Sequence, residues 1–341
     1  MTDPAALAPD APDPALAPAA PADAERLAER LARVRAAVAE RVVGQDQVID
    51  EALVTVLARG HALLEGVPGT AKTLLVRALA GALGAAFNRV QFTPDLMPSD
   101  VTGVSVLRDG DGGRRFEFLP GPVFTDLLLG DEINRAPAKT QAALLEAMAE
   151  RQVTVDGQTR RLGEGFTVFA TQNPVEFEGT YPLPEAQLDR FLLKIRVGYP
   201  DAAAELAVLD RYAAGWDAER PADAAPPPVL DAADRALLRT AADAVTVAPE
   251  VRAYVVALVR ATRDEPSLTL GGSPRATVAL FRAARAAALL AGRAFATPDD
   301  VKAYAPAVLR HRVILAPELE VEQRSADDVL AAVLDRVPAP R

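Results

Sequence analysis

The 341-residue sequence contains no cysteine and only two histidines, His61 and His311. The chain therefore forms no disulfide and no thiolate metal site, and two histidines disfavour a histidine-based zinc site. No apolar run approaches the roughly 18 residues that a membrane-spanning helix needs, and the first residues lack the basic and apolar regions of a signal peptide. We therefore expect a cytoplasmic protein without a membrane partner.

Positive charge is also scarce, because 37 Lys and Arg residues stand against 47 Asp and Glu residues, for a net charge of −10. A nucleic-acid motor generally carries a basic track, and anionic membranes attract basic surfaces. The acidic balance disfavours both kinds of partner, although it leaves room for a local basic patch. The length and the hydrophobic fraction of 50% predict two domains and a substantial core.

The sequence is organised around the stretch Gly66-Val67-Pro68-Gly69-Thr70-Ala71-Lys72-Thr73. It follows a short apolar run and precedes a run with helical spacing, which is the layout of a phosphate-binding P-loop. The unpaired N–H groups and partial positive charge of a helix N-terminus can hold a polyphosphate. Gly66 and Gly69 allow a tight turn close to phosphate oxygens. Lys72 is placed to reach the β and γ phosphates, and the Thr73 hydroxyl to ligate Mg²⁺.

Ala71 departs from this pattern, because the usual P-loop has glycine before its lysine. We expect right-handed helical dihedrals at position 71, where a Cβ is tolerated. The alternative is a glycine-containing connection that binds nothing, which the Lys-Thr pair at a helix start disfavours.

Two carboxylates, Asp131 and Glu132, follow the apolar strand predicted for residues 124–129. Carboxylates at the end of a buried strand face the ligand crevice of an α/β protein. Asp131 is placed to hold Mg²⁺ through its water shell, and Glu132 to polarise the attacking water. The alternative, a solvated acidic turn, is weaker downstream of a P-loop.

Three further residues are candidates whose ordinary readings stay open. Asn173 follows the strand predicted for residues 166–171, where its amide can reach the γ phosphate and the attacking water, or it can simply initiate a turn with Pro174. Arg190 lies at the start of a predicted strand. It is either a solvated charge or a group that acts on another subunit. Arg275 falls in the first turn of a helix capped by Ser273 and Pro274, where it either projects into a nucleotide cleft or lies on the surface.

The chain divides into four segments by composition and periodicity. Residues 1–22 are Ala/Pro-rich and predict a disordered tail, and a helix follows from about residue 24. Residues 23–200 predict an α/β core with two β-hairpins, at 101–118 and around Asp156-Gly157. Residues 201–230 predict a helix and a Pro-rich linker with a loop at 216–229, and residues 231–337 predict helices. An apolar turn at Val43 and Gly44 either flanks an adenine ring or is an ordinary helix–helix turn.

With these residues assembled, the chain resembles the AAA+ ATPases and, within them, the MoxR family. The resemblance spans about residues 24–337 and rests on these segments: 65–73, 131–136, 170–174, 183–191, 273–276 and 297–301. Ala71 is usual in this family. The two hairpins look like the helix-2 insert and the insert before sensor 1 that define its wider clade. The implied fold is an α/β core with a parallel five-stranded sheet in the order 5-1-4-3-2 and a small all-α lid.

The resemblance also implies roles for the candidate residues. Lys72 and Thr73 look like Walker A residues, and Asp131 and Glu132 like Walker B. Asn173 looks like sensor 1, Arg190 like an arginine finger that acts on a neighbour's nucleotide, and Arg275 like sensor 2. The implied ATP-binding set is Val43, Gly44, Gly66, Pro68, Gly69, Thr70, Ala71, Lys72, Thr73 and Arg275.

The sequence thus predicts an enzyme that hydrolyses ATP with Mg²⁺ in a ring homo-oligomer, typically a hexamer. MoxR-like ATPases resemble chaperones that remodel, mature or insert metals into a client protein, often beside a von Willebrand factor A-domain partner. One alternative is a nucleic-acid-stimulated motor of the helicase type, and another is an ATP switch that does not hydrolyse its nucleotide. The first draws on arginines on or near the hairpins: Arg114, Arg115, Arg160 and Arg161.

Overall fold

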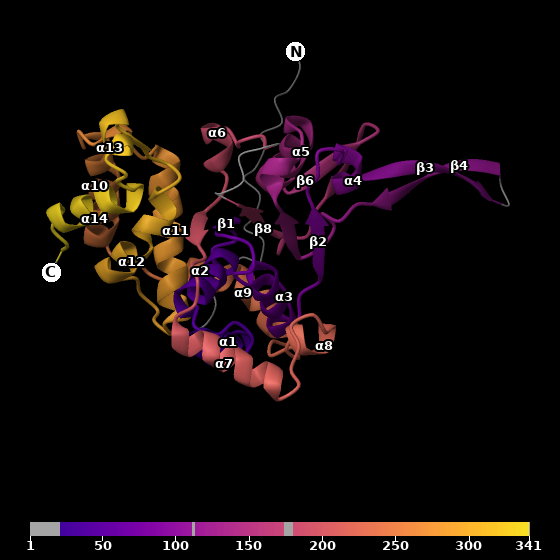
Figure 1. Cartoon of the computed structure of the whole chain (residues 1–341), viewed down its shortest axis with the longest axis horizontal. Coiled ribbons are helices and arrows are strands. Elements are labelled where there is room, and N and C mark those ends of the chain that lie inside the picture. Colours follow the sequence, from indigo (N-terminus) through magenta and orange to yellow (C-terminus); the bar gives the residue numbers. More distant parts are fainter. Residues whose placement is uncertain (1–20, 111–112, 174–179, 341) are drawn as a thin grey trace, which may run out of the picture.

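The computed structural model describes residues 21–110, 113–173 and 180–340. A five-stranded sheet in the order β2-β5-β8-β1-β9 lies at its centre, with every neighbouring pair parallel (Figure 1). Counted among themselves the strands read 2-3-4-1-5, so the predicted order 5-1-4-3-2 is confirmed when read from the other edge. The strands are β1 (Ala62–Glu65), β2 (Phe87–Gln91), β5 (Leu127–Asp131), β8 (Thr167–Gln172) and β9 (Leu193–Arg196).

The sheet is apolar on both faces, because each face is covered by helices. Leu127 and Leu129 of β5 pack into one hydrophobic core, and Leu128 between them packs into the other. The first core is built with α1 (Pro21–Ala39), α2 (Asp46–Leu57) and α3 (Lys72–Leu83), and the second with α5 (Ala138–Glu150). The first helix begins at Pro21, so residues 21 and 22 are helical instead of belonging to the tail. The rest of the predicted tail lies outside the described residues.

Both predicted hairpins are present. β3 (Gly103–Gly110) pairs with β4 (Gly113–Pro120) and projects far from the body of the molecule (Figure 1). β6 (Gln152–Val155) pairs with β7 (Gln158–Arg161), joined by Asp156 and Gly157 with φ of 50° and 75°, as a two-residue hairpin turn of type I′ requires. Two strands begin two or three residues later than predicted, because residues 101–102 end α4 (Pro98–Thr102) and residues 124–126 are bends before β5. The strand predicted from residue 166 begins one residue later, at Thr167.

The helices after residue 231 form a lid whose interior is continuous with the first core. Buried residues of α1 and α2 join those of the lid in one hydrophobic cluster. The lid is therefore packed against the core and not only connected to it through the chain. The part of the chain described contains no helix that is both long and apolar enough to cross a bilayer. The lid is not purely helical, because a short antiparallel ribbon pairs β10 (Leu268–Leu270) with β11 (Ile314–Leu315). Its helices are α9 (Ala232–Ala244), α10 (Pro249–Arg263), α11 (Pro274–Leu290), α12 (Pro298–Leu309), α13 (Pro317–Val321) and α14 (Ala326–Arg336).

Capping explains where several of these helices begin. Thr297 and Ser325 each form a capping box with the Asp three residues later, which supplies acceptors to N–H groups of the first turn. Ser273 is the N-cap residue of α11 as predicted, although its hydroxyl makes no capping bond. The predicted loop at 216–229 contains one short helix, α8 (Pro221–Ala224).

One buried arginine, in the turn after α12, ties the lid to the core. Arg312, 9% exposed, donates to Asp189 Oδ1 over 2.7 Å and to the carbonyl oxygens of Phe191 and Leu192 over 2.6 and 3.0 Å. The segment between α6 (Glu185–Leu188) and β9, which carries Arg190, is thereby fixed in place.

His61, immediately before β1, is a buried group whose ionisation bears on stability. The Val168 N–H donates to Nδ1 over 3.0 Å, so Nε2 carries the hydrogen and donates to the Met148 carbonyl over 3.1 Å. Burial, and secondarily the charge of Arg151, lowers the pKa of His61 from 6.5 to about 3. The imidazole is therefore neutral in the folded protein.

Since the unfolded chain binds a proton at His61 below pH 6.5 and the folded chain does not, stability must fall as the pH drops from 6.5 toward 3. At pH 5 this one group removes about 2 kcal/mol from the free energy of unfolding. In His61→Gln, the loss of unfolding free energy between pH 7 and pH 5, measured by urea denaturation, should be smaller by about 2 kcal/mol than in the unsubstituted chain. Equal losses in the variant and the unsubstituted chain would refute the assignment.

Candidate active site

The P-loop joins β1 to α3 and forms a tight cradle. A Cβ on Gly66 would lie 2.3 Å from the Val197 carbonyl oxygen, so only glycine fits beside the end of β9. Lys72 Nζ donates to the carbonyl oxygens of Gly66 and Val67, each over 2.7 Å, and lies 3.4 Å from Thr70 Oγ1. The first turn of α3 contains no acidic residue, so nothing there opposes the positive end of the helix dipole. This cradle fits an anionic group.

Ala71 does not have the right-handed dihedrals predicted for it. Its φ is 60° and its ψ is 21°, in the left-handed region, and α3 begins only at Lys72. The prediction was wrong because residue 71 is the last residue of the turn and not the first of the helix. A Cβ in this conformation costs about 1 kcal/mol or more. This conformational strain is at Ala71, where the turn must present its backbone N–H groups.

Asp131 lies at the carboxyl end of β5 with both carboxylate oxygens engaged. Oδ1 accepts from the Thr171 hydroxyl over 2.6 Å, and Oδ2 from Arg89 Nη2 over 2.6 Å. Thr171 is on β8 and Arg89 on β2, the two strands that flank β5. Three neighbouring strands thus fix one carboxylate, and Asp131 and Arg89 both line the same cavity.

Glu132 follows β5 in a left-handed conformation, with φ of 57° and ψ of 50°. Its N–H donates to Thr171 Oγ1 over 2.8 Å, and its Oε2 accepts from Gln91 Nε2 over 2.8 Å. Arg135, in the short helix η2 (Ile133–Arg135), lies 3.4 Å from the same oxygen. The strained backbone turns the carboxylate toward β2 and keeps it in the cavity lining.

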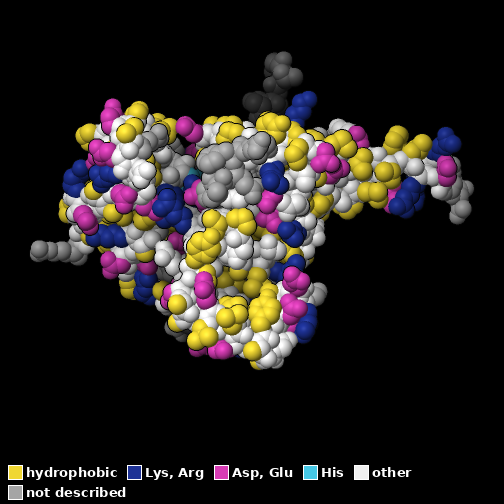
Figure 2. Space-filling model, in the orientation of Figure 1, with side chains coloured by type: hydrophobic (Ala, Val, Ile, Leu, Met, Phe, Trp, Pro, Cys, Tyr) yellow, Lys and Arg dark blue, Asp and Glu magenta, His cyan; other side chains and the backbone are white. Residues whose placement is uncertain are grey.

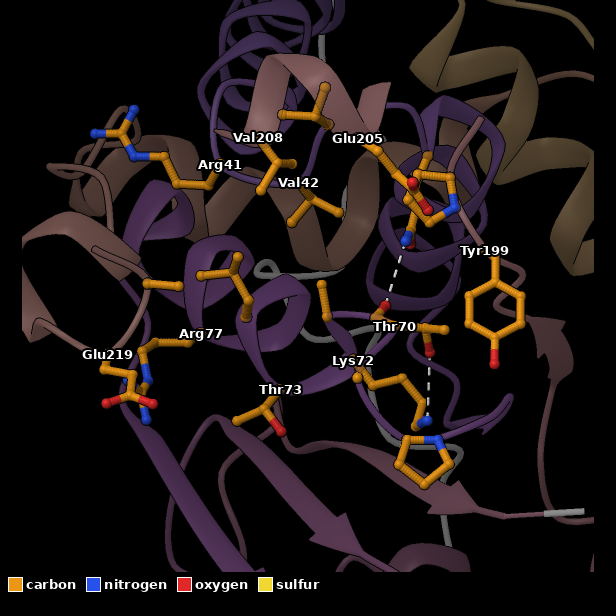
Figure 3. A pocket seen from close by; sticks show the side chains of 18 of the residues that line it. Arg41, Val42, Thr70, Lys72, Thr73, Arg77, Tyr199, Glu205, Val208 and Glu219 are labelled. Carbon is orange, nitrogen blue, oxygen red and sulfur yellow. Dashed lines mark hydrogen bonds between the residues drawn. The ribbon is translucent and has the colours of Figure 1, made fainter. Parts of the chain in front are cut away.

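A cavity of about 1070 Å³ brings most of the predicted residues together (Figure 3). Burial lowers the pKa of Lys72, while the charges of Asp131 and Glu132 oppose that shift. The P-loop and both carboxylates face this cavity, and so does Asn173 beyond β8, which is 8% exposed. Of the predicted residues, Val43, Pro68, Gly69, Thr70, Ala71, Lys72, Thr73, Asp131, Glu132 and Asn173 line it.

Sequence reasoning missed the opposite wall of this cavity. That wall is α7 (Ala202–Ala213) with the turns before and after it, which were predicted only as a helix and linker. The helix folds back over the P-loop, and Gly44 permits its approach, because a Cβ there would lie 2.5 Å from Ala204 Cβ. No local signal marks this fold-back, which depends on tertiary packing. The lining residues from this region are Tyr199, Pro200, Glu205, Val208, Leu209, Arg211, Tyr212, Trp216, Ala218 and Glu219.

Arg190 and Arg275 do not line this cavity. Arg190 is exposed and donates from Nη1 to the Leu145 carbonyl. Arg275 has 75% of its side chain exposed and lies 3.9 Å from Asp189 Oδ2. Of its two readings, Arg275 therefore fits the surface position within its own chain. Helix α12 of the lid contacts β9, and the contact with Asp189 brings Arg275 close to the residue that precedes Arg190.

Comparison with known proteins agrees with this geometry. A family model described as "ATPase family associated with various cellular activities (AAA)" matches residues 61–193, and one described as "AAA lid domain" matches residues 260–333. "Chaperone MoxR1" of Mycobacterium tuberculosis is 43% identical over 338 residues, covering 95% of this chain and 86% of that protein. "Protein MoxR" of Methylorubrum extorquens is 38% identical over 332 residues, covering 91% and 95%. The chain belongs to the MoxR family of AAA+ ATPases.

Other relatives extend the match. "Uncharacterized protein YeaC" of Bacillus subtilis is 47% identical over 299 residues, covering 88% of this MoxR-family chain and 91% of that protein. A crystal structure of a Cytophaga hutchinsonii protein superposes with a TM-score of 0.84 at 39% identity, covering 94% of this chain and 98% of the other. The predicted family and its α/β core with a lid are therefore confirmed.

The central place of the Thr171 hydroxyl can be tested by stability. Thr171→Val leaves the Glu132 N–H and Asp131 Oδ1 without their shared partner, which should reduce the free energy of unfolding by about 1–3 kcal/mol. Thr171→Ser keeps the hydroxyl and should recover most of that loss in urea denaturation. Thr154→Val, at an exposed position on β6, should change stability by less than about 0.5 kcal/mol. If Thr171→Val proves as stable as that control, the hydroxyl does not organise the site.

Proposed function

We propose that this chain is a chaperone-like ATPase that hydrolyses ATP with Mg²⁺ in a ring of identical subunits and uses the energy to remodel a client protein. The observation that carries the proposal is the cavity in which the P-loop, two strand-end carboxylates and Asn173 meet. The P-loop, the two carboxylates and Asn173 lie at the carboxyl ends of three different strands, β1, β5 and β8, of one parallel sheet. That edge of the sheet is where ligands usually bind in such folds.

The residues divide the chemistry among them. The P-loop and Lys72 hold the β and γ phosphates, and the Thr73 hydroxyl and Asp131 provide the oxygen donors that Mg²⁺ prefers. When bound, Mg²⁺ neutralises charge on the phosphates. Glu132 accepts the proton of the attacking water, and Asn173 orients that water. Release of Glu132 from Gln91 and of Asp131 from Arg89 would accompany loading of the site.

The arginines outside the cavity fit a site completed by a second subunit. Arg275 of the lid lies 3.9 Å from Asp189, the residue that precedes Arg190 in the core. Neither reaches the cavity of its own chain, so we assign both to the neighbour's γ phosphate. Such arginines stabilise the charge of the transition state and are worth about 10³–10⁵ in turnover in other NTPases. A ring, typically of six subunits, supplies this arrangement.

The projecting hairpin favours a protein client over nucleic acid. Its exposed side chains include Leu107 and Phe116, which are 51% and 78% exposed, and Figure 2 shows apolar atoms along its length. Arg114 lies 3.0 Å from Asp109, and the Arg160 guanidinium lies 3.9 Å from the Phe118 ring. These arginines are thus partly engaged within the protein. Since one relative is named a chaperone, we propose a cytoplasmic role in maturing or inserting metal into a client, beside a von Willebrand factor A-domain partner.

The test is the Glu132→Gln variant. It keeps the size of the side chain and removes the base, so turnover should fall by about 10²–10⁴-fold. Binding of ATP, measured by calorimetry, should stay within a few-fold of the unsubstituted protein. Glu146→Gln, an exposed position on α5, makes the same change of charge outside the cavity and should leave both quantities unchanged.

Two results would count against the proposal. Undiminished hydrolysis in Glu132→Gln would exclude that carboxylate as the base, and no hydrolysis by the unsubstituted protein would favour the non-hydrolysing switch. Addition of duplex or single-stranded DNA should leave the rate unchanged. Stimulation by DNA that weakens with salt would favour the motor instead.

A further inference from the structure

Arg89 lines the cavity but takes no part in the chemistry proposed above, beyond its release from Asp131. It lies on β2, the edge strand next to β5. Its Nε and Nη2 atoms both donate to Asp131 Oδ2, over 3.1 and 2.6 Å. Its Nη2 also donates to Gln91 Oε1 over 3.1 Å, which fixes the guanidinium on the strand. The guanidinium is thus held against the carboxylate that we propose as a Mg²⁺ ligand.

Asp131 needs a positive charge beside it. Only 13% of its side chain is exposed, and a carboxylate that is largely removed from water is costly unless it is paired. The Thr171 hydroxyl donates to Oδ1 over 2.6 Å but carries no charge. Arg89 supplies the compensating charge at ion-pair distance.

The charge of Asp131 acts on the part of the cavity that would hold phosphates. Burial lowers the pKa of Lys72, and the charge of Asp131 opposes that shift, so the carboxylate and the ammonium interact. A triphosphate held by Lys72 brings several negative charges close to this carboxylate, and an uncompensated carboxylate would repel them. Two positive charges are supplied here when Mg²⁺ is bound. At any step without Mg²⁺, the compensation must come from the protein.

We propose that Arg89 is the counter-ion that neutralises Asp131 whenever Mg²⁺ does not, and that it thereby lets the cavity accept a triphosphate ahead of the metal. Arg89 and Mg²⁺ are alternative partners of one carboxylate, so the ion pair weakens as the metal binds. The inference rests on the proposed function, because it requires a nucleoside triphosphate and Mg²⁺ in this cavity. Arg89 is a positioning residue, since it acts through Asp131 and not on the reacting atoms.

The experiment measures how far nucleotide binding depends on Mg²⁺. Dissociation constants of the β,γ-imido analogue of ATP, which is not hydrolysed at that bond, are measured by calorimetry in excess EDTA and in excess Mg²⁺. In Arg89→Met, the ratio of the first constant to the second should rise about tenfold over that of the unsubstituted protein. The rise is expected because the analogue meets an uncompensated carboxylate only in EDTA. Binding in Mg²⁺ should stay within a few-fold, which also shows that the variant is folded.

Two further replacements separate charge from hydrogen bonding. Arg89→Gln keeps a hydrogen-bond donor and loses the charge, so its ratio should rise as in Arg89→Met. Arg89→Lys keeps the charge, so its ratio should stay within a few-fold of the unsubstituted value. An unchanged ratio in both uncharged variants, or equal weakening in EDTA and in Mg²⁺, overturns the inference.

A double-variant cycle with Asp131→Asn distinguishes compensation of the carboxylate from direct binding of phosphate. If Arg89 acts through Asp131, Arg89→Met should cause little further loss of binding in EDTA once the carboxylate is removed. A loss as large as that in the chain with Asp131 intact would mean that Arg89 binds phosphate itself, which contradicts the inference.

Arg77→Met is the matched control. Arg77 lines the same cavity from α3, and within the described part of the chain no ion pair joins it to Asp131. Its ratio should stay within a few-fold of the unsubstituted value, and a rise as large as that of Arg89→Met would overturn the inference. Failure of the unsubstituted protein to bind the analogue in either condition would refute the nucleotide site itself. That result is distinct from binding with an unaltered ratio.

Discussion

The common direction of the five core strands is the constraint on which the rest of this structure depends. Parallel strands end at one edge of the sheet, so the P-loop after β1, Asp131 on β5 and Asn173 after β8 meet there. The Thr171 hydroxyl then joins two of these strands by donating to Asp131 and accepting from the Glu132 N–H. Backbone direction collects the groups, and one hydroxyl sets their orientation.

The parts of the site that the sequence could predict are those carried by local patterns. A glycine-containing turn before a helix, and carboxylates after an apolar strand, can be recognised from a few consecutive residues. The backbone at Ala71 was predicted wrongly, because local spacing does not tell whether a residue ends a turn or begins a helix. The ion pair of Arg89 with Asp131 and the wall formed by α7 depend on tertiary packing across the sheet edge. The spacing of residues in the sequence does not reveal such packing.

The fold divides the proposed chemistry between two regions of the surface. The residues to which we assign binding and water activation face the cavity, whereas Arg275 lies 3.9 Å from Asp189, the residue before Arg190. The lid is not a free arm that could swing Arg275 over the cavity of its own chain. Its hydrophobic core is continuous with that of the sheet, and Arg312, in the turn after α12, binds Asp189 next to Arg190. In the proposed ring, each chain therefore has a complete cradle and supplies the closing arginines of another chain's cradle.

Subunit mixing tests this division most directly. Lys72→Ala removes the phosphate-binding cation but leaves Arg190 intact, whereas Arg190→Ala leaves the cradle intact. Each variant alone should hydrolyse ATP poorly, and an equal mixture should hydrolyse it faster than the two separate rates predict. Replacing the first variant with the double variant Lys72→Ala/Arg190→Ala should abolish the gain. Full turnover by Arg190→Ala alone, or a mixture no faster than the sum of its parts, would contradict a site completed by a neighbouring subunit.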